Sequence, residues 1–359
     1  MGRFLRGLVA ALVAVAVSVV VPAVARALPV SRPVPPGFTP SSTSWTSDRQ
    51  GWLLGFTPCP SGQCPVLLRT ADGGARWWPA GTPPVRLSPR NFQVRVFFAD
   101  DEVGLVTDGE RLYATHTAGR RWQRVRLPAG TSVTIGALAA NDQALYAIVD
   151  DDSGTRLYSS PLHVTRWRPV PGVALPGPGE PGGGGDVVAH GHTAHVVLDD
   201  LFVAGGYWST TGGAWEPAEP PCDVDAVPDL GLAPDGALYA LCSYDPGMGF
   251  MFKDLKRPNP GGGFTFVGSA PVDGITTAFG AASATTVAVG AIGEGAAFVH
   301  RGTGGGAEWQ TPLVLDGVPI SDLTFTDATH GFLMWGGPPW SEAAVYRTSD
   351  AGATWAPIA

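Results

Sequence analysis

The sequence predicts an all-β protein that forms a single β-propeller of seven four-stranded blades. Two observations lead to this prediction. The octet T-x-D-x-G-x-x-W occurs twice, at residues 70–77 and 348–355. Between these copies, aromatic residues recur at intervals of 45 to 49 residues, which matches the length of a four-stranded propeller blade.

The octet has the chemistry of a tight hairpin turn. Asp72 and Asp350 stand at its third position, where a carboxylate can accept hydrogen bonds from backbone N–H groups of the turn. Gly74 and Gly352 follow two residues later, where a residue without a Cβ adopts a positive φ at no steric cost. The closing Trp begins the next strand and offers a large apolar surface for burial between sheets.

The other copies of the octet are found from their last residue and from the glycine three positions before it. The aromatic anchors are Trp77, Trp122, Trp167, Trp215, Phe264, Trp309 and Trp355. Three positions earlier stand Gly74, Gly119, Val164, Gly212, Gly261, Gly306 and Gly352. Only the first and last copies keep the Asp, and the third copy has neither Gly nor Asp. The period is therefore retained, whereas the turn chemistry has changed in most copies.

Each octet follows a pattern of strand, short polar turn and strand. Residues 45–54, 97–105, 232–241 and 323–335 show this pattern in the first, second, fifth and seventh units. Together with the strands on either side of the octet, one unit contains about four short strands, as a propeller blade does. Seven units predict seven blades, with six or eight as the alternative counts. Residues 41–359 are then one ring and not two domains.

The octets resemble the Asp-box, or BNR, repeat of sialidases and related propellers. A Gly-Trp strand such as Gly51-Trp52, followed by the octet at 70–77, is similar to the propellers of the photosystem II assembly factor family and its secreted bacterial relatives. The resemblance covers nearly the whole mature chain. It implies an architecture and no particular activity, because in these families the Asp-box is structural and lies away from the active site.

Residues 1–27 have the features of a secretory signal peptide. Arg3 and Arg6 precede an apolar run over residues 8–21, and Ala25-Arg26-Ala27 matches a cleavage site. The run is shorter than the about 20 residues of a transmembrane helix, and an uncleaved N-terminal anchor is the alternative interpretation. Residues 28–40, with five prolines, are either a Pro-rich leader or a strand that closes the ring against the last strand. We expect a protein secreted to the cell exterior or envelope, without stable membrane insertion after cleavage.

The net charge limits the classes of partner. Loss of residues 1–27 removes three arginines and no acid, so the formal charge of −8 becomes −11. Nucleic acids and anionic membranes bind through basic surfaces, and the acidic balance argues against both. We expect a monomer whose partner is a protein or a glycan that the sequence does not identify.

Four cysteines fit an oxidising compartment. Cys59 and Cys64 flank a short loop that can close on itself, which leaves Cys222 and Cys242 as a second pair. The second pair would join the start of the fifth unit to its second strand. This is one of three connectivities for four cysteines. A metal site is the alternative, although Cys-x4-Cys is a loose spacing for one.

A sialidase is the first enzyme that the repeat suggests, and the sequence departs from that family. Its chemistry needs three arginines on the substrate carboxylate, a Tyr nucleophile supported by Glu, and an Asp acid/base. Neither Ser31-Arg32-Pro33 nor Ser88-Pro89-Arg90 reproduces the family's Arg-Ile-Pro type motif. Sialidases also have six repeats, whereas this chain has seven. We therefore assign no catalytic residue and keep an exo-sialidase or other glycoside hydrolase as the alternative function.

Acidic and histidine clusters are the remaining candidates for chemistry. The acidic residues at 100–102, 150–152 and 199–200 fall at turns between strands, where Asp is favoured for bonding the backbone. His190, His192 and His195 could bind a transition metal but also fall on such a turn. Turn chemistry explains both sets, so the sequence predicts neither a metal site nor a cofactor.

Aromatic residues outside the octets are the remaining candidates for a binding surface. Inter-blade packing accounts for most tryptophans of the chain, whereas Trp340 lies in a loop with two glycines and two prolines and is predicted to be exposed. An exposed Trp can stack on a sugar ring or anchor a protein partner. The sequence thus predicts a secreted, non-catalytic binding or scaffold propeller, with Trp340 as its candidate binding residue.

Overall fold

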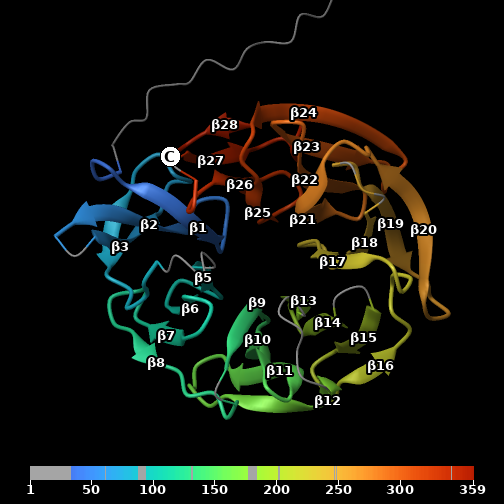
Figure 1. The fold of residues 1–359 in the computed structure, drawn as a ribbon, viewed down its shortest axis with the longest axis horizontal. Coiled ribbons are helices and arrows are strands. Elements are labelled where there is room, and N and C mark those ends of the chain that lie inside the picture. The colour runs from blue at the N-terminus through green and yellow to red at the C-terminus, as the bar shows by residue number, and fades with distance from the viewer. Residues whose placement is uncertain are drawn as a thin grey trace, which may run out of the picture.

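The computed structural model describes residues 34–359 apart from 61, 88–93, 131, 177–183, 201–202, 246, 248 and 341. The described chain contains no helix and forms seven four-stranded antiparallel sheets arranged in a ring (Figure 1). Each sheet uses four consecutive strands, of which the first lies nearest the centre of the ring (Figure 1). The predicted all-β, seven-bladed propeller is confirmed. The predicted signal peptide at 1–27 lies outside the described residues.

The first four blades use the strands β1 to β16 in chain order. Blade one contains β1 (Thr39–Trp45), β2 (Gly51–Cys59), β3 (Gly62–Thr70) and β4 (Trp78–Gly81). Blade two contains β5 (Arg95–Phe98), β6 (Val103–Thr107), β7 (Leu112–His116) and β8 (Gln123–Arg124). Blade three contains β9 (Thr134–Ala140), β10 (Ala144–Asp151), β11 (Gly154–Pro161) and β12 (Arg168–Pro176). Blade four contains β13 (Gly184–His190), β14 (Thr193–Asp200), β15 (Val203–Thr210) and β16 (Glu216–Ala218).

The last three blades follow the same order. Blade five contains β17 (Val227–Leu232), β18 (Leu238–Tyr244), β19 (Phe252–Pro258) and β20 (Phe264–Ala270). Blade six contains β21 (Ile275–Ser283), β22 (Thr286–Gly293), β23 (Ala296–Thr303) and β24 (Glu308–Asp316). Blade seven contains β25 (Ile320–Phe325), β26 (Gly331–Gly336), β27 (Ala343–Thr348) and β28 (Ala356–Pro357).

The antiparallel order gives the ring two faces with different connections. The first and third hairpins of every blade lie on one face, which we call the octet face because the third hairpins are the octets. The second hairpins and the connections between blades lie on the opposite face, the connection face. The strand order alone therefore determines on which of the two faces each loop lies.

Hydrophobic side chains fill the spaces between neighbouring blades. Trp52 of β2 stacks on Phe98 of β5 with ring centroids 3.9 Å apart, which joins blades one and two. Trp45 of β1 stacks on Phe332 of β26 with centroids 3.4 Å apart, which joins blades one and seven. Flat rings remove much apolar surface from water at each contact and favour offset stacking. The core is therefore a series of clusters between blades.

The first octet turn is held by threonine as well as by aspartate. The buried Oγ1 of Thr70 accepts the N–H of Gly74 at 3.0 Å, and Oδ1 of Asp72 accepts the N–H of Arg76 at 2.9 Å. The last octet repeats both bonds at 2.9 and 2.8 Å. The N–H of Gly73 then bonds the carbonyl of Arg49 in the first hairpin, which ties the two hairpins of the octet face together.

The altered octets keep parts of this turn. Thr117 takes the place of the Asp in the second copy, and its Oγ1 accepts the N–H of Arg121 at 3.0 Å. A positive φ is found, as expected, at Gly74, Gly119, Gly212, Gly306 and Gly352. The expectation for Gly261 is wrong, because in the fifth copy Gly262 and Gly263 adopt the positive φ. The two glycines that follow Gly261 allow the turn to form later in that loop.

The aromatic anchors of the octets lie inside the ring. Trp77, Trp167 and Trp355 are buried, and the other four anchors, Trp122, Trp215, Phe264 and Trp309, are partly buried. Trp355 packs on Phe325 of its own blade, whereas Trp215 of blade four packs on Tyr146 of blade three. The spacing of the anchors thus reflects repeated burial at equivalent places.

Side-chain packing closes the ring between blades seven and one. Thr39 and Pro40 pair with β2, so the described end of segment 28–40 belongs to the inner strand of blade one. The short last strand β28 pairs with β27. Phe38 and Ile358 meet in the hydrophobic cluster that contains Trp45. Among the described residues, the two chain ends meet through this cluster and not through paired strands.

Candidate functional site

The central channel of the ring forms a cavity with a volume of about 1010 Å³. Its wall is formed by residues of the inner strands of all seven blades, and by Gly336, Pro338, Pro339 and Trp340 at the second hairpin of blade seven. That hairpin lies on the connection face. A cavity of this size falls at the upper end of the range of small-molecule pockets.

Polar side chains link the inner strands around the channel. Oγ of Ser42 accepts the N–H of Val96 at 3.1 Å, across the boundary between blades one and two. Oδ2 of Asp186 in β13 accepts the N–H of Leu230 in β17 at 2.9 Å, across the boundary between blades four and five. Thr43 donates its hydroxyl to Asp322 of β25 at 3.0 Å, across the boundary between blades seven and one. These groups act as inter-blade contacts and give the channel its polar wall.

Three carboxyl groups and one guanidinium group stand at the start of the inner strands. Asp186, Asp229 and Asp322 are each the third residue of their strand, and Arg95 is the first residue of β5. The inner strands begin at the connection face, so these groups lie in the half of the channel nearest that face. Asp186, Asp322 and Arg95 line the cavity. Asp229 is not among the described residues that line it.

Burial raises the pKa of all three carboxyl groups. Burial raises the pKa of Asp229 to about 7, with further contributions from the negative charges of Asp186 and Asp199. Burial raises the pKa of Asp322 to about 6, against the lowering effects of the Thr43 hydroxyl and Arg95. Burial also raises the pKa of Asp186, although its bonds to backbone N–H groups and the charge of Arg95 oppose the shift. Arg95 thus compensates Asp186 and Asp322 but not Asp229.

Trp340 stands at the mouth of the channel on the connection face. It is 42% exposed and lines the cavity together with Pro338 and Pro339. The backbone N–H of Trp340 bonds the carbonyl of Gly337 at 2.9 Å, and the N–H of Gly337 bonds the carbonyl of Glu342 at 3.0 Å. The loop is thus a closed turn that presents an aromatic ring to solvent.

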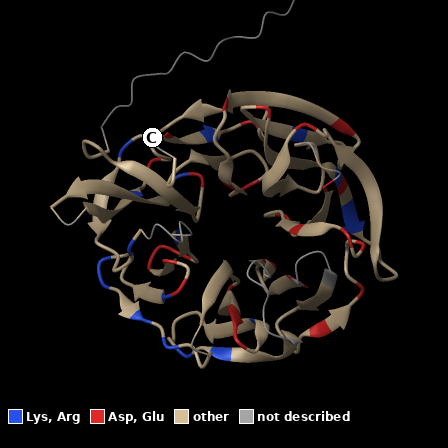
Figure 2. Ribbon diagram, viewed as in Figure 1, with Lys and Arg blue, Asp and Glu red and all other residues tan. Residues whose placement is uncertain are grey.

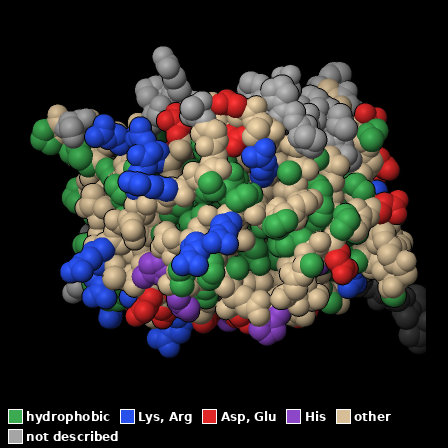
Figure 3. Space-filling view, turned by 90° about the horizontal axis from the view of Figure 1, so that it is seen from below, with side chains coloured by type: hydrophobic (Ala, Val, Ile, Leu, Met, Phe, Trp, Pro, Cys, Tyr) green, Lys and Arg blue, Asp and Glu red, His purple; other side chains and the backbone are tan. Residues whose placement is uncertain are grey.

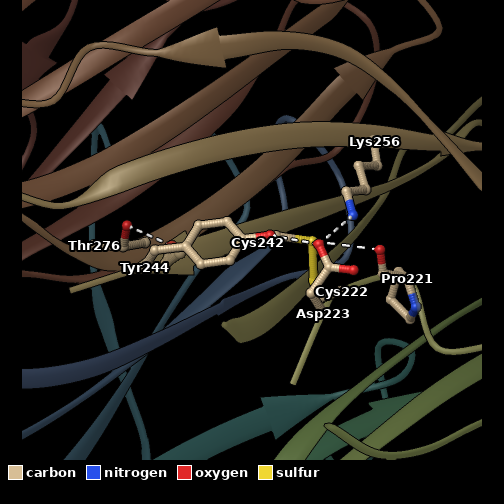
Figure 4. Close-up of a disulfide and its surroundings, with 8 residues drawn as sticks. Pro221, Cys222, Asp223, Cys242, Tyr244, Lys256 and Thr276 are labelled. Carbon is tan, nitrogen blue, oxygen red and sulfur yellow. Dashed lines mark hydrogen bonds and ion pairs between the residues drawn. A yellow bond between two sulfur atoms is a disulfide. The ribbon is translucent and has the colours of Figure 1, made fainter. Parts of the chain in front are cut away.

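Two disulfides fix loops of the connection face. Cys59 and Cys64 are bonded across the second hairpin of blade one, and Cys222 is bonded to Cys242 of β18 (Figure 4). Both predicted pairs are present. Beside the second disulfide, Asp223 accepts a hydrogen bond from the hydroxyl of Tyr244 at 3.1 Å and lies 3.6 Å from Nζ of Lys256 (Figure 4). The connection before blade five is therefore attached to the second and third strands of that blade.

Two of the acidic clusters of the sequence contain turn residues. Oδ1 of Asp100 accepts the N–H groups of Glu102 and Val103, each at 2.7 Å. Asp151 is buried and accepts the N–H groups of Gly130 and Ser153. These two clusters serve backbone bonding, as their positions predict. In the third cluster, Asp199 lies near the end of β14, and its charge contributes to the raised pKa of Asp229.

The three histidines do not form a metal site. His190, the last residue of β13, and His192, in the turn between β13 and β14, are both exposed. His195 is partly buried on β14, with Nδ1 at 2.8 Å from the hydroxyl of Tyr207, and burial lowers its pKa to about 4. Among the described residues, no group of three or more His, Cys, Asp or Glu side chains has an arrangement that could hold a metal ion.

The surface charge is uneven although the net charge is negative. Six arginines of blades two and three, on or beside the outermost strands β8 and β12, are exposed; they are Arg120, Arg121, Arg124, Arg126, Arg166 and Arg168. Figure 2 shows the basic residues gathered around β7 and β8, and Figure 3 shows basic side chains grouped on that side of the ring. We call these six residues the arginine rim. None of them forms an ion pair with another described residue.

Sequence reasoning missed the channel carboxyls and a second exposed tryptophan, Trp78. The signal for the carboxyls is an isolated Asp inside an otherwise apolar strand, as in Val227-Pro228-Asp229-Leu230, because alternate residues of a strand face opposite sides. The signal for Trp78 is its position next to Trp77, since two adjacent residues of an extended chain cannot both face the core.

Comparison with known proteins supports the fold. Neither the protein-family models nor the curated proteins give a match. Among solved structures, YCF48 bound to a D1 peptide is 18% identical, with a TM-score of 0.53, over 88% of this chain and 95% of that chain. An ulvan lyase of polysaccharide lyase family PL25 is 11% identical, with a TM-score of 0.56, over 90% and 93% of the two chains.

A third structure shows the same likeness over part of a longer chain. Puromycin hydrolase is 15% identical, with a TM-score of 0.59, over 92% of this chain and 54% of that chain. The neighbours therefore include a peptide-binding protein as well as enzymes. At these identities the likeness shows the fold alone, which is the seven-bladed β-propeller.

Proposed function

We propose that this protein is a secreted binding propeller, without catalysis of its own, that engages a protein or glycan partner at the cell envelope. The observation that carries the proposal is the channel mouth on the connection face. There a closed turn presents the exposed ring of Trp340 beside a cavity of about 1010 Å³. Exposed Trp is among the residues most often found at the energetic centre of binding interfaces.

The channel groups support binding more than catalysis. Asp186 and Asp322 are each engaged with a neighbouring inner strand, through Leu230 and Thr43. Arg95 is the one arginine among the described residues of the channel wall, whereas sialidase chemistry requires three on the substrate carboxylate. We therefore propose that the charged groups of the wall hold the inner strands together and give the mouth its polarity.

Secretion is supported by the disulfides and by the sequence of residues 1–27. The two disulfides are of the kind that form in oxidising compartments. Residues 1–27 have a positively charged start, an apolar run and a cleavage site, as a secretory signal peptide does.

A carbohydrate-active enzyme is the second candidate function. It is favoured by the neighbouring carboxyl groups of Asp186 and Asp229, because burial raises the pKa of Asp229 to about 7, as it does for the general acid in glycoside hydrolysis. An oligogalacturonate lyase and the ulvan lyase share the fold. Against it, Asp229 is not among the residues that line the cavity, so a substrate in the channel would not meet both carboxyls.

The test uses residues 28–359 and the variant Trp340→Ala on an array of glycans and purified extracellular proteins. We expect the protein to bind a subset of the array, and the variant to bind at least about tenfold more weakly, as for a central interface aromatic. Fluorogenic sialoside and glycoside substrates are assayed on the same preparation. Turnover that is lost in Asp186→Asn would establish the enzyme instead.

A further inference from the structure

A second recess lies between blades one and two, at the outer edge of the octet face. Its volume is about 460 Å³. Its walls come from the end of β3 and the following turn, from β4, and from the octet turn of blade two; they are formed by Arg69, Thr70, Ala71, Trp78, Pro79, Ala80, Ala118 and Arg120. The recess is thus on the opposite face of the ring from Trp340.

Trp78 presents an aromatic face to this recess. Its neighbour Trp77 is buried and packs edge-on against Trp45, whereas Trp78 is 43% exposed. Trp78 pairs across the sheet with Arg69 of β3, so both side chains lie on the same face of blade one. Packing explains why the anchors of the octets are buried or partly buried aromatic residues. It does not explain why a tryptophan stands at the exposed position 78.

Two guanidinium groups flank this aromatic face. Arg69 lies over the ring of Trp52, 5.3 Å from its centroid, and its one ion pair, with the exposed Asp101, is 3.9 Å long. Arg120 is exposed, and its Nε donates to the carbonyl of Thr117 at 3.1 Å, which orients the side chain. No described residue accepts a hydrogen bond from the two terminal nitrogens of Arg120.

The backbone beneath Arg120 is fixed. Ala118 adopts a φ of 55° and donates its N–H to the carbonyl of Glu102 at 2.9 Å. Gly119 donates its N–H to the buried Oγ1 of Thr115 at 3.1 Å. Arg120 therefore extends from a rigid turn, and the arginine rim continues from it along blade two. Neighbouring positive charges raise the local concentration of anions.

We propose that this recess binds an anionic sugar residue, with its ring on Trp78 and its carboxylate or sulfate between Arg69 and Arg120. Guanidinium groups bind such oxyanions through paired hydrogen bonds. The flat exposed ring of Trp78 suits the apolar face of a pyranose, and the volume falls within the range of small-ligand pockets. This site goes beyond the proposed function, because it lies on the other face from Trp340.

An acidic peptide is the competing class of ligand, and the wall fits it less well. Extended peptides bind by adding main-chain hydrogen bonds along a strand edge. β4 has only four residues, and its second residue, Pro79, carries no N–H donor. The polar groups of the recess come mainly from the two cationic side chains, which suit a compact ring with an ionised substituent.

The test measures binding of residues 28–359 to a tetrasaccharide of a hexuronic acid by isothermal titration calorimetry. The matched ligand is the same tetrasaccharide with its carboxyl groups methyl-esterified, which keeps the rings and removes the charge. The variants are Trp78→Ala and Arg120→Gln. Phe266→Ala and Arg124→Gln are their controls, since Phe266 is an exposed aromatic residue of β20 in blade five and Arg124 lies in β8 outside the recess.

We expect the acidic tetrasaccharide to bind and the ester to bind at least about tenfold more weakly, since the charge-assisted bonds are lost. Trp78→Ala and Arg120→Gln each lower the affinity by at least about tenfold, whereas the two controls stay within about twofold of the unchanged protein. Absence of binding at millimolar concentration, or equal affinity of Trp78→Ala, would overturn the proposal. So would an oligoglutamate peptide that binds more tightly than the saccharide and depends on the same two residues.

Discussion

Asp229 is the partly buried carboxyl group of β17 whose charge Arg95 does not compensate, and its replacement by Asn should stabilise the fold above neutral pH. Burial, together with the charges of Asp186 and Asp199, raises its pKa from 3.8 to about 7. The folded chain then holds a proton that the unfolded chain releases between about pH 4 and pH 7. Stability must therefore fall as the pH rises through this window, and the full cost is present above pH 7.

The magnitude follows from the shift of the pKa. A difference of about three pKa units corresponds to about 4 kcal/mol of unfolding free energy above pH 7, because one unit is about 1.4 kcal/mol. At pH 4.5 most of this cost is absent, since the unfolded carboxyl group is itself partly protonated. The side chain of Asp229→Asn cannot ionise. The difference in unfolding free energy between this variant and the unchanged protein should therefore shift by about 3 kcal/mol in favour of the variant between pH 4.5 and pH 8.

The assay is chemical denaturation of residues 28–359 and of Asp229→Asn at pH 4.5 and pH 8. The control is Asp225→Asn, which removes a carboxylate from an exposed position just before the same inner strand. We expect the pH-dependent gain in Asp229→Asn and not in the control. A variant Asp229→Asn that is less stable at pH 8 than the unchanged protein would show that this carboxylate is ionised and favourably paired in the folded chain, and would contradict a raised pKa for Asp229.

Three further predictions concern the turns and loops. Asp350→Ala removes the acceptor of the Thr354 N–H, and we expect a loss of about 1–3 kcal/mol in chemical denaturation; an unchanged midpoint would count against the turn chemistry. Gly119→Ala places a Cβ 2.5 Å from Cδ2 of the buried Leu67 and puts an alanine at a φ of 86°. We expect the variant to lose about 1–3 kcal/mol of unfolding free energy and to have a lower Tm; an equal Tm would show that the turn is not constrained. Replacing Cys222 and Cys242 together by Ala should cost about 3 kcal/mol, measured as the difference in unfolding free energy, and a neutral double variant would contradict a stabilising role for this disulfide.

The ring could be predicted from the sequence because each blade needs a large apolar side chain at the same place. The anchors from Trp77 to Trp355 are buried or partly buried at equivalent places, so their spacing survives even where the turn has lost its Asp or Gly. Thr117 shows how this happens, since its hydroxyl replaces the aspartate at the same backbone N–H. Because packing sets the period, the spacing of the anchors is kept even in copies whose turn residues have changed.

The candidate sites could not be predicted to the same extent, because they are formed by residues far apart in the sequence. Asp186 and Asp229 come from different blades, and their mutual effect on pKa depends on the curvature that brings β13 and β17 together. The recess beside Trp78 needs the octet turn of the next blade as its second wall. Trp340 could be identified from sequence because its exposure follows from its own loop.

The most direct test of the proposed binding function is the paired measurement of binding and turnover on one preparation of residues 28–359. We expect the protein to bind members of a glycan and extracellular-protein array, Trp340→Ala to weaken this binding at least about tenfold, and fluorogenic sialosides and glycosides to stay unhydrolysed. Hydrolysis that disappears in Asp186→Asn, with array binding unaffected by Trp340→Ala, would contradict the proposed function.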